Sequence, residues 1–206
     1  MPDPINLAAD LPIYLTAMLV GYLLGSIPFG LILTKFAGLG DIRKIGSGNI
    51  GATNVLRTGK PTLAAFTLAL DAVKGALAVL LGKTLGPDIA VLAATGAILG
   101  HTFPVWLGFA GGKGVATAIG IMVALFWPVG LLVIGTWILT AVTTRYSSLS
   151  SLLSIGLAPV YFWLAAQYQM AEVSLLIAAL VFLRHKDNIA RLISGTESRL
   201  GRSKTS

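Results

Sequence analysis

The sequence predicts an all-α polytopic membrane protein, and three observations lead to this fold class. Of the 206 residues, 55% are hydrophobic and only 11% are charged, whereas a soluble domain carries about 25% charged residues. The mean hydropathy is +0.84. The apolar residues form long runs separated by short polar segments, as expected for successive membrane spans. We expect a single integral membrane domain over residues 1–206, with flexible ends at residues 1–10 and 201–206.

The apolar runs predict seven transmembrane helices, some of them short. A helix crosses the bilayer core with roughly 20 apolar residues, or with fewer when it packs inside a bundle. The predicted spans are about residues 11–36, 62–85, 89–109, 115–126, 129–144, 149–165 and 173–183.

Two interruptions shape this assignment. Residues 25–30 (GSIPFG) lie inside the first run, so we expect a kink whose freed backbone groups are satisfied by neighbouring helices. Residues 115–144 are too long for one crossing and contain Pro128, so they are divided there into two spans. Without this division, six spans would place Arg145 in the membrane or move the last basic segment to the other side.

The distribution of charge orients the seven helices. One face receives nearly all the basic residues, namely Lys35, Arg43, Lys44, Arg57, Lys60, Lys113, Arg145, Arg184, Lys186, Arg191, Arg199, Arg202 and Lys204. The opposite face receives Lys83 beside Asp3, Asp10, Asp88 and Glu172. Because basic loops stay in the cytoplasm, we predict an outside N-terminus and a cytoplasmic C-terminus. The basic cytoplasmic loops then account for the net charge of +7, and no nucleic-acid partner is expected.

Composition also limits the chemistry. The chain has no cysteine, which excludes disulfides, thiolate nucleophiles and cysteine-ligated metals. Two histidines and few carboxylates do not favour a metal centre. The N-terminus lacks the basic start and cleavage site of a signal peptide, so the first run is expected to remain as a span.

The first polar segment, residues 47–57 (SGNIGATNVLR), follows the first span. Its glycines let the backbone turn N–H groups toward an anion, beside Ser47 and Asn49. A short helix from about Ala52 would point its N-terminus at a phosphate, and Arg57 offers a fork for bidentate contact. The alternative is an ordinary glycine-rich interfacial loop with a snorkelling arginine.

The second polar segment, residues 111–117 (GGKGVAT), opens the fourth span. Gly111, Gly112 and Gly114 would let an oxyanion approach N–H groups at a helix start, and Lys113 supplies charge. The spacing of a P-loop and its preceding strand are missing. A glycine turn with a cytoplasmic lysine is the alternative.

The third polar segment, residues 185–192 (HKDNIARL), follows the last span. His185, Asn188 and Arg191 would lie along one side of a helix that continues from this span. His185 can transfer a proton near neutral pH, Asn188 can donate and accept, and Glu197 could reach back to a base or an amide. The alternative is a basic helix that binds lipid headgroups.

Further polar residues fall at membrane depth. Asp71 and Lys74 are three residues apart in the second span and are expected to pair. We interpret this pair as support for the bundle, and His101 as a histidine that packs between helices.

Taken together, these segments resemble the bacterial acyl-phosphate:glycerol-3-phosphate acyltransferases, a family of small integral membrane enzymes of phospholipid synthesis. The similarity includes residues 25–30, 47–57, 101–117 and 185–197 in this order, and so extends over nearly the whole chain. It implies a seven-helix fold in the bacterial cytoplasmic (inner) membrane, with the active site facing the cytoplasm. It also implies acyl transfer from acyl phosphate to the 1-hydroxyl of glycerol 3-phosphate, giving lysophosphatidic acid, with no cofactor and no obligatory protein partner.

The resemblance and the residue chemistry together assign roles to the polar residues. The catalytic group is Ser47, His185 and Asn188. The substrate-binding group is Arg57, Lys113, Gly111, Gly112, Gly114 and Asn49. The structural group is Glu197, Asp71 and Lys74.

Two other classes of protein compete with an acyltransferase. A transporter for an organic anion would place its site near the bilayer midplane, whereas the three polar segments are predicted at one face. A structural subunit would need no such segments. An enzyme that acts on phosphate-bearing substrates at the cytoplasmic face is therefore the prediction.

Overall fold

The computed structural model describes residues 7–201, and every regular element in this range is helical. The helices are α1 (Leu7–Gly25), α2 (Phe29–Phe36), α3 (Ala52–Leu56), α4 (Pro61–Lys83), α5 (Pro87–Thr102), α6 (Val115–Leu125), α7 (Trp127–Thr144), α8 (Ser147–Leu164), α9 (Tyr168–Arg184) and α10 (Lys186–Ile193), with 3-10 turns at Ile42–Lys44 and Val105–Leu107. The predicted flexible ends fall mostly on residues 1–6 and 202–206, outside the described range, whereas residues 7–10 belong to α1.

Five stretches are long and apolar enough to cross a membrane. They are Asp10–Phe36, Pro61–Lys83, Pro87–Leu107, Trp127–Thr144 and Ser147–Leu164. The other two predicted spans correspond to shorter helices, α6 with 11 residues and α9 with 17 residues.

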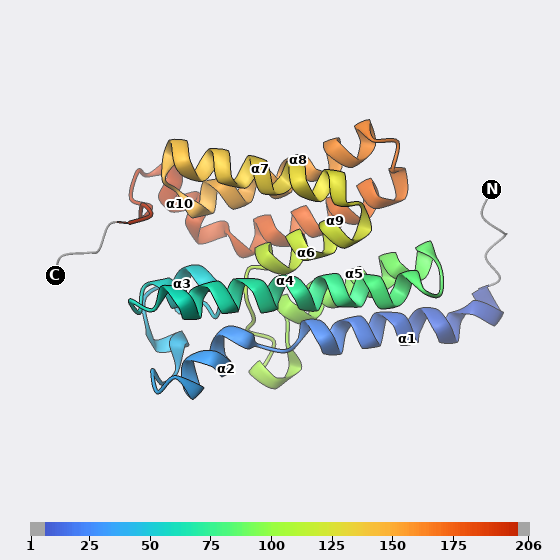
Figure 1. The fold of residues 1–206 in the computed structure, drawn as a ribbon, viewed down its shortest axis with the longest axis horizontal. Coiled ribbons are helices and arrows are strands. Elements are labelled where there is room, and N and C mark those ends of the chain that lie inside the picture. The colour runs from blue at the N-terminus through green and yellow to red at the C-terminus, as the bar shows by residue number, and fades with distance from the viewer. Residues whose placement is uncertain (1–6, 202–206) are drawn as a thin grey trace.

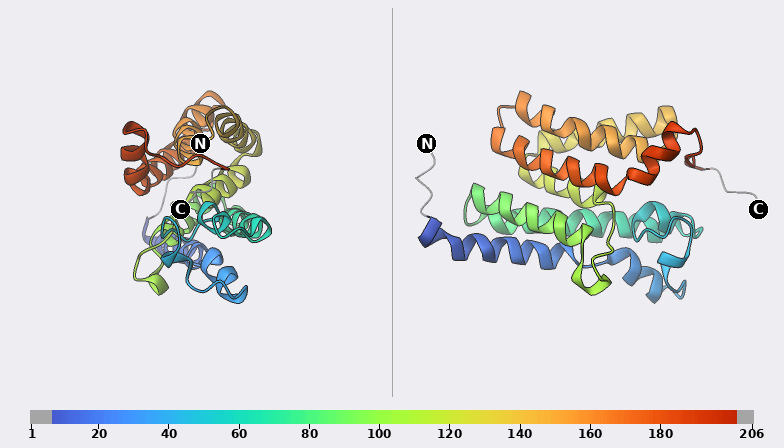
Figure 2. Two further views of the ribbon diagram at one scale, coloured as in Figure 1. Left: turned by 90° about the vertical axis from the view of Figure 1, so that its left-hand side faces the viewer. Right: turned by 180° about the vertical axis from the view of Figure 1, so that it is seen from behind.

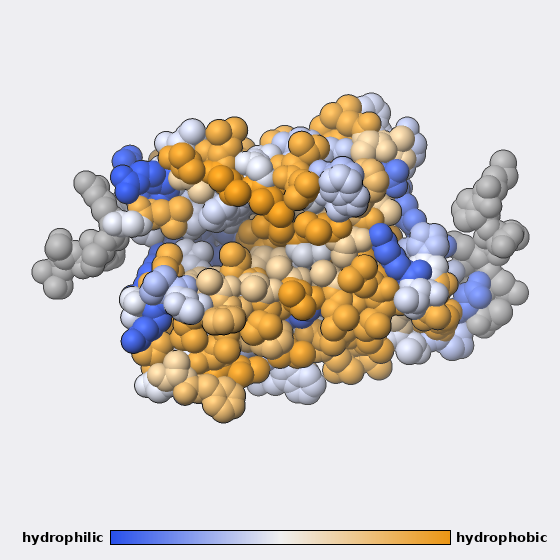
Figure 3. Space-filling view, in the orientation of Figure 1, coloured by the Kyte–Doolittle hydropathy of each residue, from blue (hydrophilic) through white to orange (hydrophobic). Residues whose placement is uncertain are grey.

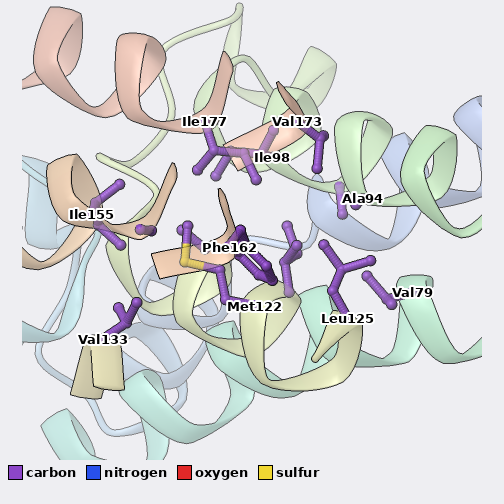
Figure 4. Packing of buried hydrophobic residues seen from close by; sticks show 14 of the residues in the cluster. Val79, Ala94, Ile98, Met122, Leu125, Val133, Ile155, Phe162, Val173 and Ile177 are labelled. Carbon is purple, nitrogen blue, oxygen red and sulfur yellow. The ribbon is translucent and has the colours of Figure 1, made fainter. Parts of the chain in front are cut away.

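The helices run along one long axis in two layers (Figures 1 and 2). One layer contains α1, α4 and α5, the other contains α7, α8 and α9, and α6 lies between them and contacts both. The core fills the space between the layers, where Ile98, Met122, Phe162 and Ile177 are fully buried (Figure 4). Helix α1 begins at one end of the long axis, whereas α3 and α10 lie at the other end (Figure 1).

On the face shown in Figure 3, the surface is apolar around the middle and hydrophilic toward both ends of the long axis. Large side chains such as Leu15 and Leu139 are 58% and 67% exposed. Apolar surface of this extent is rare on soluble monomers, and it is the surface that lipid would cover.

Glycines bring α1 and α5 into close contact. A Cβ on Gly21 or Gly25 of α1 would overlap the backbone of α5, and a Cβ on Gly96 or Gly100 of α5 would overlap the backbone of α1. Small residues of this kind let membrane helices pack backbone to backbone.

Helix breaks bring the polar segments together, and the sequence predicted some of these breaks. The expected kink in the first span is the break between α1 and α2, and the expected division at Pro128 is the break between α6 and α7. The third span, in contrast, was predicted to continue to residue 109, but α5 ends at Thr102. Residue 103 precedes a proline and is therefore biased away from helical geometry.

The predicted continuous helix through the third polar segment is also wrong. Helix α9 ends at Arg184, and α10 starts at Lys186 in a new direction (Figure 1). His185 lies between them with φ −103° and ψ 10°, outside helical geometry.

Candidate active site

A buried asparagine, Asn54 of α3, organises the first polar segment. Its Nδ2 donates to the carbonyls of Ile42, Ile45 and Asn49 over 3.1, 2.9 and 2.8 Å. Its Oδ1 accepts from the N–H of Ser47 over 2.9 Å. Sequence analysis did not single out Asn54, because its partners lie 5–12 residues away along an irregular loop.

This loop presents three of the predicted site residues. Ser47 and Arg57 are exposed, and Asn49 is half-buried. The Oδ1 of Asn49 accepts from the N–H of Gly51 over 2.8 Å, so this oxygen is used by a local turn. The predicted short helix is present as α3.

The second polar segment begins partway along the long axis rather than at the end that carries α3 and α10 (Figures 1 and 2). The N–H of Gly111 donates to the carbonyl of Thr102 over 3.1 Å, and the N–H of Gly112 donates to the carbonyl of His101 over 3.0 Å. The predicted approach of an oxyanion to the N–H groups of this segment therefore does not include these two, which donate to carbonyls at the end of α5 instead.

Other N–H groups of the same segment stay available. Within residues 7–201, the N–H groups of Lys113 and Gly114 have no protein acceptor. Gly114 is the N-cap residue of α6 and has φ +84°, a left-handed conformation that glycine adopts without strain. A free N–H pair at a helix start beside an ammonium group is suited to an anion.

Arg184 holds the second segment from the opposite side, and sequence analysis treated it only as a cytoplasmic base. Its Nη2 donates to the carbonyl of Gly111 over 2.8 Å, and its Nε donates to the carbonyl of Gly112 over 3.3 Å. Its place in the last turn before His185 was the available signal.

A chain of side-chain hydrogen bonds joins the second and third segments. Lys113 Nζ donates to Asn188 Oδ1, and Asn188 Nδ2 donates to Glu197 Oε1 over 2.6 Å. Arg191 Nε pairs with Glu197 Oε2, also at 2.6 Å. The expectation that Glu197 reaches back to a base or an amide is thus confirmed for both partners.

The first segment joins the same site through the chain that follows α10. Arg57 Nη2 donates to Ser198 Oγ over 2.9 Å, and Ser198 directly follows Glu197. The surface is hollowed between the two layers near α3 and α10 (Figure 3). Side chains from segments that are far apart in the sequence therefore come together near Lys113, although the second segment begins deeper along the long axis than the single face that the sequence predicted.

The environment changes the protonation of the central groups. Burial lowers the pKa of Lys113 to about 8. Burial, with the charge of Lys113, lowers the pKa of His185 to about 4, although a hydrogen bond to Val181 acts in the opposite direction. Burial raises the pKa of Glu197, but hydrogen bonds from Asn188 and Arg191 outweigh it and hold the pKa below its ordinary value.

One tautomer of His185 follows from its contacts. His185 Nδ1 lies 2.8 Å from the carbonyl oxygen of Val181. Because a carbonyl only accepts, Nδ1 carries the proton and Nε2 keeps a lone pair. The imidazole is neutral at physiological pH and can accept a hydrogen bond at Nε2.

A second polar cluster lies deeper in the bundle. Asp71 and Lys74 pair at 2.7 Å, which confirms the predicted contact. His101 Nδ1 lies 3.1 Å from Thr117 Oγ1 and 3.8 Å from Asp71 Oδ1. Among the described residues, no three His, Asp or Glu side chains are grouped as a metal site would need.

Fold and site together define a class: an integral membrane protein of apolar helices, with cationic side chains and free N–H groups gathered at one site that suits an anionic substrate. Comparison with known proteins identifies the family within this class. A sequence profile described as glycerol-3-phosphate acyltransferase matches residues 15–195. The chain belongs to this family and is an acyltransferase.

Individual relatives agree over nearly the full length. The glycerol-3-phosphate acyltransferase of Rhodopseudomonas palustris strain BisB5 is 56% identical over 193 residues, which are 93% of this chain and 98% of the relative. That of Bradyrhizobium diazoefficiens is 53% identical over 197 residues, 95% of this chain and 98% of the relative.

Solved structures show the same fold. A crystal structure of PlsY (YgiH), an integral membrane glycerol 3-phosphate acyltransferase in its glycerol 3-phosphate form, is similar with a TM-score of 0.87 and 37% identity, covering 91% of this chain and 96% of that one. The lysophosphatidic acid form of PlsY gives a TM-score of 0.85 at 36% identity, covering 91% and 95%.

Proposed function

We propose that this protein transfers a fatty acyl group from an acyl phosphate to the 1-hydroxyl of glycerol 3-phosphate, with lysophosphatidic acid as the product. The solved relatives are described as the glycerol 3-phosphate form and the lysophosphatidic acid form of their enzyme. These descriptions support the acceptor and the product. The donor is proposed from the family resemblance and from the chemistry of the site.

The observation that carries the proposal is the hydrogen-bonded chain from Lys113 through Asn188 to Glu197 and Arg191. It brings a partly buried ammonium group, two free N–H groups and the nearby Arg57 to one site. Both substrates carry phosphate, so the site needs more than one anion-binding group. An acyl phosphate has a good leaving group, so charge neutralisation and positioning are sufficient catalysis.

The reaction proceeds by direct transfer. The hydroxyl oxygen of glycerol 3-phosphate attacks the acyl carbonyl carbon and forms the new ester bond. The bond from that carbon to the bridging oxygen breaks, and inorganic phosphate leaves with the electron pair. The chain has no cysteine, and Ser47 Oγ has no hydrogen bond to a histidine within residues 7–201. Trapping an acyl group on Ser47 would overturn this step.

Each site residue has a proposed role in binding or orienting the substrates. Arg57 and Lys113 hold phosphates, and the N–H groups of Lys113 and Gly114 receive the donor phosphate or the developing oxyanion. Ser47 and Asn188 orient glycerol 3-phosphate. His185 lies among these groups, and its neutral imidazole can accept from the attacking hydroxyl.

Two roles for His185 are distinguished by its basicity. A base of pKa about 4 is weaker than a phosphate dianion, whose conjugate acid has a pKa of about 6. The pKa therefore favours His185 as a positioner, with the substrate phosphate taking the proton. A pH–rate profile of His185→Gln tests this: activity near that of the wild type excludes the base role, whereas loss of activity with a changed acidic limb supports it.

We propose that the chain crosses the bacterial inner membrane seven times as a single domain, with α1 and α2 as one crossing and α6 and α9 as short ones. This places the N-terminus outside and the site in the cytoplasm. The start of α1 and helix α10 lie at opposite ends of the long axis, which supports an odd number of crossings (Figure 1). Since the chain has no cysteine, single variants Asp10→Cys and Ser203→Cys can be labelled from one side. Labelling of both from the same side contradicts the topology.

The activity is tested with purified protein in lipid, acyl phosphate and labelled glycerol 3-phosphate, scored for lysophosphatidic acid. The wild type should form product with acyl phosphate but not with acyl-CoA or acyl carrier protein. Lys113→Met should lose activity, and Lys83→Met, at the other end of the molecule, is the matched control. No product from the wild type with intact donor would refute the proposal and favour anion transport.

A further inference from the structure

A histidine that the proposed chemistry does not use lies directly under the second polar segment. If Gly112 carried a Cβ, the three nearest atoms would all belong to the His101 imidazole, and the overlap with Nε2 would be severe. The carbonyl of His101 also accepts from the N–H of Gly112 over 3.0 Å. One residue of α5 therefore contacts Gly112 through both its ring and its backbone.

The imidazole itself is held from neighbouring helices. Its Nδ1 lies 3.1 Å from Thr117 Oγ1 on α6, and 3.8 Å from Asp71 Oδ1 on α4. His101, Thr117 and Asp71 are all buried. The ring thus bridges the helices on both sides of the loop that carries Gly112.

The same network reaches the break in the first span. Lys74 pairs with Asp71 at 2.7 Å and also donates to the carbonyl of Ile27 over 2.7 Å. This carbonyl lies between α1 and α2, where the helical hydrogen bonds stop. Ionisable groups inside a membrane bundle are costly and usually functional, and here they fix the surroundings of one ring.

We propose that His101 is a positioning residue for Lys113. Its imidazole packs against Gly112 and fixes the position of this residue. The Asp71–Lys74 pair keeps the ring in place, and Arg184 donates to the carbonyls of the same loop from the other side. Residue 112 is glycine because of the imidazole and not because of an anion. The link to catalysis rests on the proposed acyltransferase reaction, whereas the packing does not.

Gly111 provides a matched control for this inference. A Cβ on Gly111 would overlap the backbone carbonyls of His101 and Thr102 and the ring of Pro104. Truncation of the His101 side chain removes none of these atoms. A clash at residue 112 can therefore be relieved by His101→Ala, but a clash at residue 111 cannot.

The test combines Gly112→Ala and Gly111→Ala, each with and without His101→Ala. Gly112→Ala should lower kcat/KM by about 100-fold, the size of effect that a small misplacement of a binding group causes, and should lower the thermal unfolding midpoint. In the Gly112→Ala background, His101→Ala should raise kcat/KM by at least about tenfold and should raise the thermal unfolding midpoint. As a single variant, His101→Ala should lower kcat/KM. Gly111→Ala should gain nothing from His101→Ala.

A readout without substrate separates this inference from the proposed function. In a Lys113→Cys background, the rate of maleimide labelling reports where residue 113 lies. Gly112→Ala should change this rate and addition of His101→Ala should return it toward the reference value. The inference is overturned if the double variant is no better than Gly112→Ala, or if the midpoint recovers while the labelling rate does not. A wild type that makes no lysophosphatidic acid would refute the proposed function alone.

Discussion

The protonation of Lys113 predicts an alkaline limit on activity. Burial lowers the pKa of this ammonium group from 10.5 to about 8; the charge of Glu197 opposes the shift, and those of Arg191 and Arg57 add to it. The charged form therefore predominates below pH 8 and is lost as the pH rises through this value. If the ammonium binds a phosphate, kcat/KM of the free enzyme should fall above pH 8.

The expected size follows from the titration of one group. One unit above the pKa, about a tenth of the molecules keep the proton, so kcat/KM should fall about tenfold for each further unit. The phosphates of the substrates have a second pKa of about 6 and do not change charge over this range. A guanidinium stays charged at all these values, so Lys113→Arg should show no alkaline fall, whatever its activity at pH 7.

The assay measures initial rates of lysophosphatidic acid formation from pH 6.5 to about 9.5 at low substrate concentration, with spontaneous hydrolysis of the donor subtracted. The Lys113→Arg variant is the comparison, and Lys83→Met is the control for a remote lysine. A wild-type profile that stays level to pH 9.5, or an equal fall in Lys113→Arg, would show that Lys113 does not supply the binding charge.

Three further predictions concern the supports of the site. Arg184→Ala removes both donors to the carbonyls of Gly111 and Gly112, so kcat/KM should fall by about 10- to 100-fold. Unchanged kinetics would contradict a role of Arg184 in holding the second polar segment. Glu197→Gln should lose about 1–3 kcal/mol of stability. Because the pKa of Glu197 in the folded protein lies below its ordinary value, the difference in unfolding free energy between wild type and variant should be present above about pH 4.5 and shrink below it. Denaturation at several pH values measures this difference. Lys74→Met leaves Asp71 buried without its partner and should cost about 3–5 kcal/mol. The exposed Lys83 loses only one hydrogen bond, from its Nζ to the carbonyl of Leu125, so Lys83→Met should cost about 0.5–1.5 kcal/mol; equal unfolding midpoints for the two variants would contradict this.

The helix breaks that could be predicted are those with a local cause. Pro28 and Pro128 remove backbone donors within apolar runs, so the ends of α1 and α6 follow from the chain itself. The pairing of Asp71 with Lys74 follows from their spacing on one helix. In each case the interacting residues are neighbours in sequence.

The remaining features depend on contacts between distant residues. Arg184 contacts Gly111 and Gly112 from more than 70 positions away. Its place beside His185 indicates proximity to the site but not these two partners. The turn at His185 has no proline or glycine to announce it. The N–H groups of Gly111 and Gly112 bond to the carbonyls of Thr102 and His101 at the end of α5. The end of that helix has a local cause in Pro104, but the hydrophobic pattern alone extended the span to residue 109 and so hid these contacts.

The broken helices also explain why the site is basic. A break at membrane depth frees both carbonyl and N–H groups, and neither can be left unsatisfied in an apolar surrounding. Here side chains of the protein meet the carbonyls: Trp106 donates to that of Ser26, and Lys74 to that of Ile27. Arg184 donates to the carbonyl of Gly111 in the second polar segment. The N–H groups of Lys113 and Gly114 are not matched by the protein in the same way within the described residues. In the proposed function a substrate phosphate accepts from these N–H groups, because the protein satisfies the freed carbonyls itself and leaves donors at a helix start for an anion.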